Sequence, residues 1–359
     1  MATKSLGIDI REANESGAGK GRYTLEVTKA LIENASEDVR FFLFTKKPNP
    51  AFPHSERVSQ VVINGRSIWW HLRLRNFLRR HPVDLFLAPT SFIYAALAPA
   101  KQKVAIVVHD LIAFLYSKTH ARFPTLVERI TLRRAIRKSR FIVCVSQNTA
   151  KDLASLFPEA HKKPVLIAPP AVSPEVHKVE SEKMDLPAHY LLGVGTLSPR
   201  KNFKLLFEAF TLLADQHPHL HVVIAGGSGW KTSQVYKTVP AALKNRIHFL
   251  GYVSVDQLNE LYSRAEMLIF PSIYEGFGIP PLEAMACHCP VITSNAASLP
   301  EVVADAAIQV DPQNPQALAD AINEMFTPQV RLAYQKRGLI RAHHFSWEAS
   351  AQQILKQLR

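Results

Sequence analysis

The sequence predicts an α/β protein with two doubly wound domains, each built on a parallel β-sheet. Its 359 residues correspond to about two domains. In the second half, short apolar runs alternate with stretches of helical periodicity, which is typical of βαβ units with helices on both sheet faces. The expected strands are 190–196, 221–227, 247–251, 267–270 and 291–293. The expected helices are 202–216, 232–244, 255–264 and 281–287.

The first half repeats this pattern less regularly, with apolar runs at 41–45, 84–88, 104–108 and 141–145. Between the halves lies a proline-rich, polar stretch that could not fill a core, which is typical of a linker. The sequence therefore predicts an N-terminal domain over 1–172, a linker over 173–187 and a C-terminal domain over 188–346. Such domains bind ligands at the carboxyl ends of their strands.

Charge is distributed unevenly along the chain. The formal net charge is +13, and residues 1–180 hold the whole excess, because acidic and basic residues balance over 181–359. A basic surface attracts polyanions, which include nucleic acid, anionic membranes and acidic substrates. With 47% apolar and 20% charged residues, the composition excludes a disordered chain.

The three cysteines, Cys144, Cys287 and Cys289, are too few for a disulfide framework, which favours a reducing compartment. The first ten residues lack the features of a signal peptide, and no apolar run reaches the length of a spanning helix. We therefore expect a cytoplasmic protein whose contact with a membrane would be peripheral and at its inner face.

The most informative motif is Pro271-Ser-Ile-Tyr-Glu-Gly-Phe-Gly-Ile-Pro-Pro-Leu-Glu-Ala-Met, which follows an expected strand and opens a helix. Its glycines let the backbone approach a ligand and aim free amides at an anion or a sugar. Glu275 and Glu283 lie eight residues apart, the second expected in the first helical turn. Paired carboxylates accept hydrogen bonds from sugar hydroxyls. The alternative is a tight turn with a glutamate that favours the helix dipole.

This motif resembles the E-x(7)-E motif of the family-4 retaining glycosyltransferases, and the resemblance covers the C-terminal half and, more loosely, the first half. It implies the GT-B fold, in which two Rossmann-like domains face a cleft. It also implies that the last segment, 347–359, crosses back as a helix onto the N-terminal domain. Glu275 would contact donor-sugar hydroxyls, and Glu283 would contact the ribose of the nucleotide. The amides of Gly276, Phe277 and Gly278 would line the donor site.

Arg200 and Lys201 follow another expected strand, in Gly195-Thr-Leu-Ser-Pro-Arg-Lys-Asn-Phe. At the carboxyl edge of a parallel sheet, two cations suit a diphosphate and can stabilise the charge that develops on a leaving nucleotide. They resemble the Arg-Lys pair of the family. Many members carry a further arginine where this chain has Thr196, so one phosphate contact differs. The alternative is a solvated start of a helix.

Two N-terminal features match the family more weakly. The cluster Glu15-Ser-Gly-Ala-Gly-Lys-Gly-Arg-Tyr is not a phosphate-binding P-loop, because Gly21 rather than Ser or Thr follows its lysine. It resembles the first glycine-rich loop of the family, and the match rests on Gly19 and Gly21. His109 follows an expected strand, and the family histidine at that place projects toward the donor sugar. The alternatives are a plain loop and a structural histidine, and the role of Asp110 stays open.

Two histidine-containing patterns are expected to have no metal role. Cys287-His-Cys289 places three residues almost consecutively without a distant partner pair, which is not zinc spacing, so a buried helix end is expected. His343-His344 is expected on a solvated helix. No Asp-x-Asp pair, the metal-diphosphate motif of the other large glycosyltransferase fold, occurs in the chain. We expect no metal and no cofactor, and the nucleotide sugar would be a co-substrate.

Two basic stretches could meet a polyanion. Residues 66–80 place Trp70, Leu74, Phe77 and Leu78 on one helical stripe, which fits either a membrane interface or a buried helix face. Residues 121–140 contain a single acid, Glu128, and seven basic residues: Arg122, Arg129, Arg133, Arg134, Arg137, Lys138 and Arg140. This bias predicts a surface for anionic lipid or for a lipid-diphosphate acceptor.

Together these observations predict a retaining, metal-independent glycosyltransferase for cell-surface polysaccharide or lipopolysaccharide. The resemblance implies mannose from GDP-mannose as the donor, with UDP- or dTDP-sugars as alternatives. The acceptor would be a glycan or a polyprenol-diphosphate-linked glycan. A catalytically silent scaffold of the same fold is the alternative function. The sequence has no RNA-recognition or zinc-finger signature, so nucleic acid is not an expected partner.

Overall fold

The computed structural model describes residues 3–14, 19–116, 122–180, 182–229 and 231–358. These residues form two compact units, each with its own sheet and core. Unit 1 contains the described residues up to Pro170 together with those from Ser346 onward. Unit 2 contains Ala171–Phe345. Two parallel-sheet α/β units confirm the fold class that the sequence predicts.

Unit 1 contains a wholly parallel sheet in the order β3-β2-β1-β4-β5-β6-β7. Its strands are β1 (Lys4–Asp9), β2 (Val39–Thr45), β3 (Val58–Val62), β4 (Leu85–Ala88), β5 (Val104–Val108), β6 (Phe141–Cys144) and β7 (Val165–Ile167). The edge strands β3 and β7, which the apolar runs do not predict, have partly exposed residues. The central strands β4, β5 and β6 are buried throughout, as expected between two helical layers.

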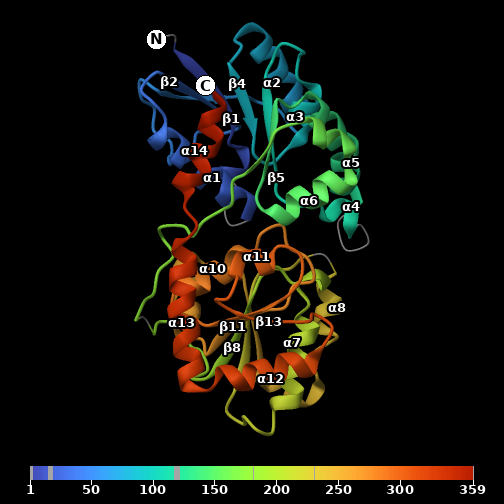
Figure 1. Cartoon of the computed structure of the whole chain (residues 1–359), viewed down its shortest axis with the longest axis vertical. Helices are drawn as coiled ribbons and strands as arrows, with labels where there is room; N and C mark the ends of the chain where they lie inside the picture. The colour runs from blue at the N-terminus through green and yellow to red at the C-terminus, as the bar shows by residue number, and fades with distance from the viewer. Residues whose placement is uncertain (1–2, 15–18, 117–121, 181, 230, 359) are drawn as a thin grey trace. The chain divides into compact units, whose positions relative to one another are not determined.

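Helices cover both faces of the unit 1 sheet. They are α1 (Gly19–Asn34), α2 (Ile68–Arg80), α3 (Phe92–Leu97), α4 (Ile112–Leu115), α5 (Arg122–Lys138), α6 (Gln147–Leu156) and α14 (Trp347–Leu355). The chain moves toward one sheet edge after β1 and toward the other after β3, so right-handed crossovers place α1 opposite α2, α3 and α5. The C-terminal helix α14, red in Figure 1, packs against α1, and Ser350 donates a hydrogen bond to the Pro169 carbonyl at 2.6 Å.

The apolar stripe of α2 belongs to the core of unit 1. Trp70 and Leu74 are fully buried, Leu78 is 2% exposed, and Phe77 packs against the same core. This confirms the buried-face alternative for residues 66–80. The guanidinium of Arg11 lies over the Trp70 ring, 3.8 Å from its centroid.

Unit 2 contains a second parallel sheet, in the order β10-β9-β8-β11-β12-β13. Its strands are β8 (Tyr190–Val194), β9 (His221–Ala225), β10 (Ile247–Gly251), β11 (Met267–Phe270), β12 (Val291–Ser294) and β13 (Ile308–Val310). The chain runs outward from β8 to one edge and from β11 to the other. Neighbouring β8 and β11 therefore flank the point where the order reverses, which is the usual ligand position in such sheets.

The helices of unit 2 are α7 (Phe203–Leu213), α8 (Thr232–Tyr236), α9 (Val255–Arg264), α10 (Ile279–Ala286), α11 (Leu299–Val303), α12 (Pro315–Met325) and α13 (Pro328–His343). One expected helix is wrong: 232–244 is interrupted after α8 and resumes as a 3₁₀ turn over Ala241–Arg246. Pro240 precedes that turn with an extended backbone, and a proline inside a helix removes a backbone donor and clashes with the preceding turn.

The stretch 173–187, expected as a linker, forms part of unit 2 and lies along α9. The Val179 amide donates a hydrogen bond to the Ser263 hydroxyl at 3.0 Å. The Met184 amide donates to the carboxylate of Glu260, which is 2% exposed, at 2.9 Å. Proline-rich composition indicated an irregular backbone, but it did not reveal these polar contacts with a neighbouring helix.

The helices of the described part of the chain fall short of the length and apolar character that a bilayer crossing requires.

Candidate functional site

The candidate site of unit 2 is formed by two loops that leave neighbouring strands. The loop after β8 contains Gly195 and the 3₁₀ turn Pro199–Lys201, and the loop after β11 contains Pro271–Gly278. The Ile273 amide donates a hydrogen bond to the Arg200 carbonyl at 2.9 Å, so the backbones of the two loops are joined. Parallel pairing of β8 with β11 thus brings together residues that are about seventy positions apart in the sequence.

Local backbone geometry places the two cations. Asn202 has a left-handed conformation with φ of 56° and donates side-chain hydrogen bonds to the carbonyls of Pro271 and Pro312, at 3.2 and 2.8 Å. Gly195 has a φ of 140°, and a Cβ at that position would lie 2.8 Å from the Lys201 Cε. Glycine at 195 therefore leaves the space that the Lys201 side chain occupies.

Arg200, Lys201 and Glu275 form a buried ion cluster. The Glu275 Oε2 is 2.7 Å from the Arg200 Nη1, and its Oε1 is 2.7 Å from the Lys201 Nζ. The Lys201 ammonium also lies 4.6 Å from the centroid of the Phe270 ring. Lys201 and Glu275 are each 9% exposed. The cluster therefore holds two positive charges close together by placing one carboxylate between them.

Burial and charge act in opposite directions on the pKa values of this cluster. Burial would raise the pKa of Glu275, but Lys201 and Arg200 outweigh it and hold that pKa below its ordinary value. Burial lowers the pKa of Lys201 more than the attraction of Glu275 raises it. An incoming anion would restore stabilisation of the positive charge on Lys201, since an opposite charge nearby favours the ionised form.

The loop from Gly276 to Gly278 is held by a serine that the motif analysis did not assign. The Ser298 hydroxyl lies 2.9 Å from the Glu275 carbonyl and 2.7 Å from the Phe277 carbonyl. Gly278 has a φ of 108° and directly precedes α10. The Phe277 ring packs edge-on against Phe345, with 5.3 Å between centroids. Both carbonyls are directed toward Ser298, and the loop runs directly into the start of α10.

Glu283 lies on α10, but its position differs from the expected one. The helix begins at Ile279, so Glu283 is in its second turn and not in its first. It is 3% exposed, and its Oε2 accepts a hydrogen bond from the Tyr262 hydroxyl of α9 at 3.1 Å. Burial and the Glu283 charge raise the pKa of Tyr262 well above its ordinary value, so the phenol remains a donor. Tyr262 therefore fixes the orientation of this carboxylate.

In unit 1, His109 follows β5 and contacts its own unit. Its Nε2 lies 2.7 Å from the Pro89 carbonyl, and its ring packs edge-on against Tyr23, with 5.0 Å between centroids. A neutral ring that donates from Nε2 carries an acceptor at Nδ1. Burial, aided by the charge of Lys20, lowers the pKa of His109 to about 4, so the ring is neutral near pH 7.

Gly19 and Gly21 lie in the first turn of α1, and residues 15–18 of the expected glycine-rich loop lie outside the described residues. Lys20, between the two glycines, has its Nζ 3.7 Å from an Asp110 carboxylate oxygen. Asp110 also accepts a hydrogen bond from the Ile112 amide at 3.2 Å. Its structural role is to link the start of α1 to the end of β5.

We expect His109 to destabilise the folded protein as the pH falls. Its pKa is about 4 in the folded state against about 6.5 in an unfolded chain, so the unfolded state binds more protons between these values. Stability is then lost as the pH decreases, by about 1 kcal/mol at pH 5.5 from this group. Urea unfolding should show that the free energy of unfolding decreases less between pH 7.5 and pH 5.5 in His109→Gln than in the unmodified chain. Equal losses would contradict a neutral, buried His109.

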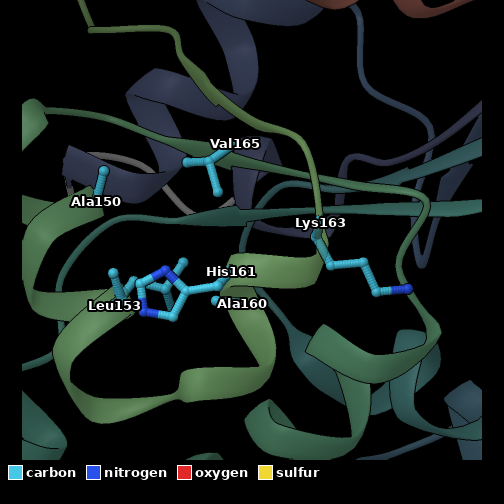
Figure 2. Close-up of a pocket in the computed structure, with 7 residues that line it drawn as sticks. Ala150, Leu153, Ala160, His161, Lys163 and Val165 are labelled. Carbon is cyan, nitrogen blue, oxygen red and sulfur yellow. The ribbon is translucent and has the colours of Figure 1, made fainter.

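The cysteines and a surface hollow contribute nothing to this site. Cys287 and Cys289 are buried free thiols, and burial raises the pKa of Cys287 to about 12. Among the described residues, no group of three or more His, Cys, Asp or Glu side chains could hold a metal ion. A hollow of about 230 Å³ in unit 1 is lined by Ala150, Leu153, Ala154, Ala160, His161, Lys163 and Val165 (Figure 2). It contains no carboxylate.

The structure brings Arg200, Lys201 and Glu275 into direct contact and places Gly276, Phe277, Gly278 and Glu283 along the continuous loop and helix that follow. His109, Gly19 and Gly21 belong to unit 1. Tyr262 and Ser298, which hold the site from other elements, were not predicted as site residues. Ser298 lies within the stretch that resembles the family, but nothing in the sequence distinguishes Tyr262 from a core tyrosine.

Comparisons with known proteins identify the family of the chain. Residues 17–176 match the family model described as Glycosyltransferase Family 4, and residues 177–345 match the one described as Glycosyl transferases group 1. O-antigen chain mannosyltransferase B of Escherichia coli is 28% identical, over 94% of both chains. An O-antigen chain mannosyltransferase of Salmonella typhimurium is 29% identical, over 89% of this chain and 90% of the relative.

Solved structures show the same fold at low identity. Sucrose-phosphate synthase of Thermosynechococcus elongatus superimposes with a TM-score of 0.79 at 18% identity, covering 99% of this chain and 98% of that one. HepE of Anabaena, in complex with UDP and glucose, gives a TM-score of 0.77 at 18% identity, covering 99% of both chains.

The fold and the family models together define a glycosyltransferase of the GT-B fold. The chain belongs to the family-4 glycosyltransferases, as the motif at 271–285 implied.

Proposed function

We propose that this chain transfers mannose from GDP-mannose to a glycan in cell-surface polysaccharide synthesis. The donor and the pathway rest on relatives named as O-antigen chain mannosyltransferases, two of which align over nearly their whole length. The observation that supports the chemistry is the buried cluster in which Arg200 and Lys201, from the loop after β8, meet Glu275, from the loop after β11.

The cations would bind the diphosphate of the donor. Arginine offers a planar fork of donors and lysine a point charge, and both act most strongly where water is excluded. As the bond from the sugar to the phosphate breaks, negative charge grows on the leaving nucleotide. Arg200 and Lys201 would stabilise that charge.

The remaining donor contacts would come from the loop and from α10. Glu275, held by the cations, would accept hydrogen bonds from sugar hydroxyls. The amides of Gly276, Phe277 and Gly278 would line the site, and the Glu283 carboxylate, oriented by Tyr262, would accept from the ribose hydroxyls. Glu275, Phe277 and Glu283 are buried, which restricts the motion of their side chains before the donor binds.

We further propose that transfer is retaining and independent of metal ions. In a front-face substitution the acceptor attacks on the side from which the diphosphate leaves, and the diphosphate takes the acceptor proton. This path needs no enzyme nucleophile, and two protein cations supply the charge that a metal would otherwise supply. No metal or cofactor is therefore proposed, and the nucleotide sugar acts as a co-substrate.

Unit 1 is proposed to bind the acceptor, a glycan or a polyprenol-diphosphate-linked glycan, at the cytoplasmic face of the membrane. Its glycine-rich helix start, with Gly19 and Gly21, and His109 lie at the carboxyl ends of β1 and β5, where such sheets bind ligands. The neutral His109 ring would offer Nδ1 to a sugar hydroxyl, and its contact with Pro89 sets the ring orientation.

Turnover of a donor panel tests this proposal. GDP-mannose, UDP-glucose and dTDP-rhamnose are each incubated with the protein, once with EDTA and once with Mg²⁺, and nucleoside diphosphate release is measured. We expect slow release from GDP-mannose that EDTA does not abolish. Release only from another donor would overturn the donor assignment, and release that requires a divalent cation would overturn metal independence. Tight donor binding without release from any sugar would instead favour a silent scaffold.

A further inference from the structure

Helix α5 of unit 1 has a buried face and an exposed face of different chemistry. Leu132, Ala135 and Ile136 are fully buried in the core, and α5 packs against α3. Figure 1 shows α5 in green at the side of the unit 1 elements. Its described side chains, from Leu126 to Lys138, therefore divide into those that hold the helix to the sheet and those that face outward.

Aliphatic side chains stand on the outward face. Leu126 is 55% exposed and Ile130 is 66% exposed, and they lie four residues apart, so they occupy the same stripe of the helix. Single exposed aliphatic residues are common, but two on one stripe that continues into arginines form an amphipathic surface.

Basic side chains surround and extend this stripe. The exposed cations of the helix are Arg129, Arg133, Arg134, Arg137 and Lys138. Only one described acid of the helix, Glu128, accompanies them, and it is not exposed. Glu159, from the 3₁₀ turn Pro158–Lys162, contacts Arg133 at 3.0 Å and Arg137 at 3.6 Å, which leaves a large positive excess. We define the α5 outer face as Leu126, Arg129, Ile130, Arg133, Arg134, Arg137 and Lys138.

After Glu159, the same 3₁₀ turn ends in the exposed Lys162, and Lys163 follows it next to α5. The turn contacts both α5 and α6, and beyond it the hollow of Figure 2 is bordered by His161 and Lys163. In Figure 2 the Lys163 side chain extends away from the His161 ring. The positive surface is thus wider than one helix.

We propose that the α5 outer face binds the surface of an anionic lipid bilayer. Arginines near a negative leaflet are attracted to it, and their aliphatic stems allow the charged groups to stay among the headgroups. Leu126 and Ile130 would enter the boundary between headgroups and acyl chains, as in interfacial helices. These two aliphatic side chains favour a bilayer over nucleic acid, whose phosphate backbone is bound by cations and polar groups. The inference deepens the proposed function, because it would place unit 1 where a lipid-linked acceptor resides.

Flotation with lipid vesicles tests this inference on the full chain. Vesicles of phosphatidylcholine alone and with about one-third phosphatidylglycerol are compared at low and high salt. We expect binding only to the anionic vesicles, weakened by salt, because exposed charges are screened within about 10 Å at 0.1 M. The variant Ile130→Glu/Arg134→Glu should reduce the bound fraction by about tenfold or more. Unchanged binding of this variant, or no binding of the unmodified chain, would overturn the proposal.

Unit 2 offers a matched control. Lys336 and Ile340 lie four residues apart on α13, both exposed, with Ile340 at 74%. The variant Lys336→Glu/Ile340→Glu changes the net charge by the same amount and should float like the unmodified chain. If both double variants lose binding equally, net charge and not the α5 outer face is responsible.

Two readouts separate this proposal from its alternatives. Stabilisation by GDP-mannose should be the same in the α5 variant as in the unmodified chain, so failure of the donor assignment and failure of the membrane surface are distinguishable. Fluorescence anisotropy with labelled duplex RNA should show no saturable binding at physiological salt. Saturable RNA binding that the α5 variant abolishes, together with no vesicle binding, would assign the surface to nucleic acid.

Discussion

Replacing Lys201 with alanine is expected to lower the kcat of donor turnover by about 10²–10³-fold, which is the usual effect of removing a group that stabilises transition-state charge. Lys201 is buried, and its ammonium lies 2.7 Å from Glu275. The missing side chain of Gly195 leaves room for the Lys201 side chain. No other lysine in the described part of unit 2 shares this cluster. The expected loss is in kcat more than in KM, because charge on the leaving diphosphate grows as the bond breaks.

Lys204→Ala is the matched control for this prediction. Lys204 lies one turn further along, in α7, is exposed, and pairs with Glu208 at 3.2 Å. Its removal should leave kcat within about twofold of the value for the unmodified chain, because an exposed ion pair contributes about 1 kcal/mol or less to stability and does not touch the ion cluster. Equal kcat values for Lys201→Ala and Lys204→Ala would contradict the role of Lys201 as a stabiliser of leaving-group charge.

Glu275→Gln is expected to destabilise unit 2 by about 3 kcal/mol at pH 7, because removing one partner of a buried ion cluster leaves charge uncompensated. The amide keeps the shape of the side chain but leaves Lys201 and Arg200 without the carboxylate between them. Because the pKa of Glu275 is held below its ordinary value, this stabilisation is present above about pH 4.5 and is lost as the pH falls through the lower folded value.

Urea unfolding at pH 7 and at acidic pH measures this effect. Glu208→Gln, at an exposed carboxylate that also pairs with a lysine, should cost about 0.5 kcal/mol or less. The difference in unfolding free energy between the unmodified chain and Glu275→Gln should decrease as the pH falls. If Glu275→Gln is as stable at pH 7 as Glu208→Gln, the Glu275 carboxylate does not hold the two cations.

Much of the fold follows from short-range patterns. The buried central strands are fully apolar, so runs such as 104–108 and 267–270 predict β5 and β11 at their observed bounds. The capping box of Ser254 and Gln257 starts α9 at Val255, as its periodicity predicts. The edge strands β3 and β7 are short, partly exposed and without an uninterrupted buried run, so local pattern could not identify them.

The sequence could propose the residues of the candidate site but not the contacts among them. Their positions after expected parallel strands placed Arg200, Lys201 and Glu275 at the carboxyl edge of the sheet, and the structure shows that they contact one another. Sequence could not reveal that one glutamate pairs with both cations, because this depends on the side-chain geometry of two loops. Nor could it reveal the hydrogen bond from Tyr262 to Glu283, since periodicity identifies which face of α9 is buried but not which polar atom that face meets.

The central claim is that unit 2 binds a nucleotide sugar through Arg200, Lys201, Glu275 and Glu283, and nucleotide-dependent thermal stabilisation tests it most directly. We predict that GDP-mannose and GDP raise the Tm of the unmodified chain, since a ligand at about 100 times its Kd stabilises by about 2.7 kcal/mol. The increase should be much smaller in Glu283→Ala, measured against the Tm of that variant without nucleotide. If no nucleotide or nucleotide sugar raises the Tm of the unmodified chain, the assignment of the donor site to unit 2 is wrong.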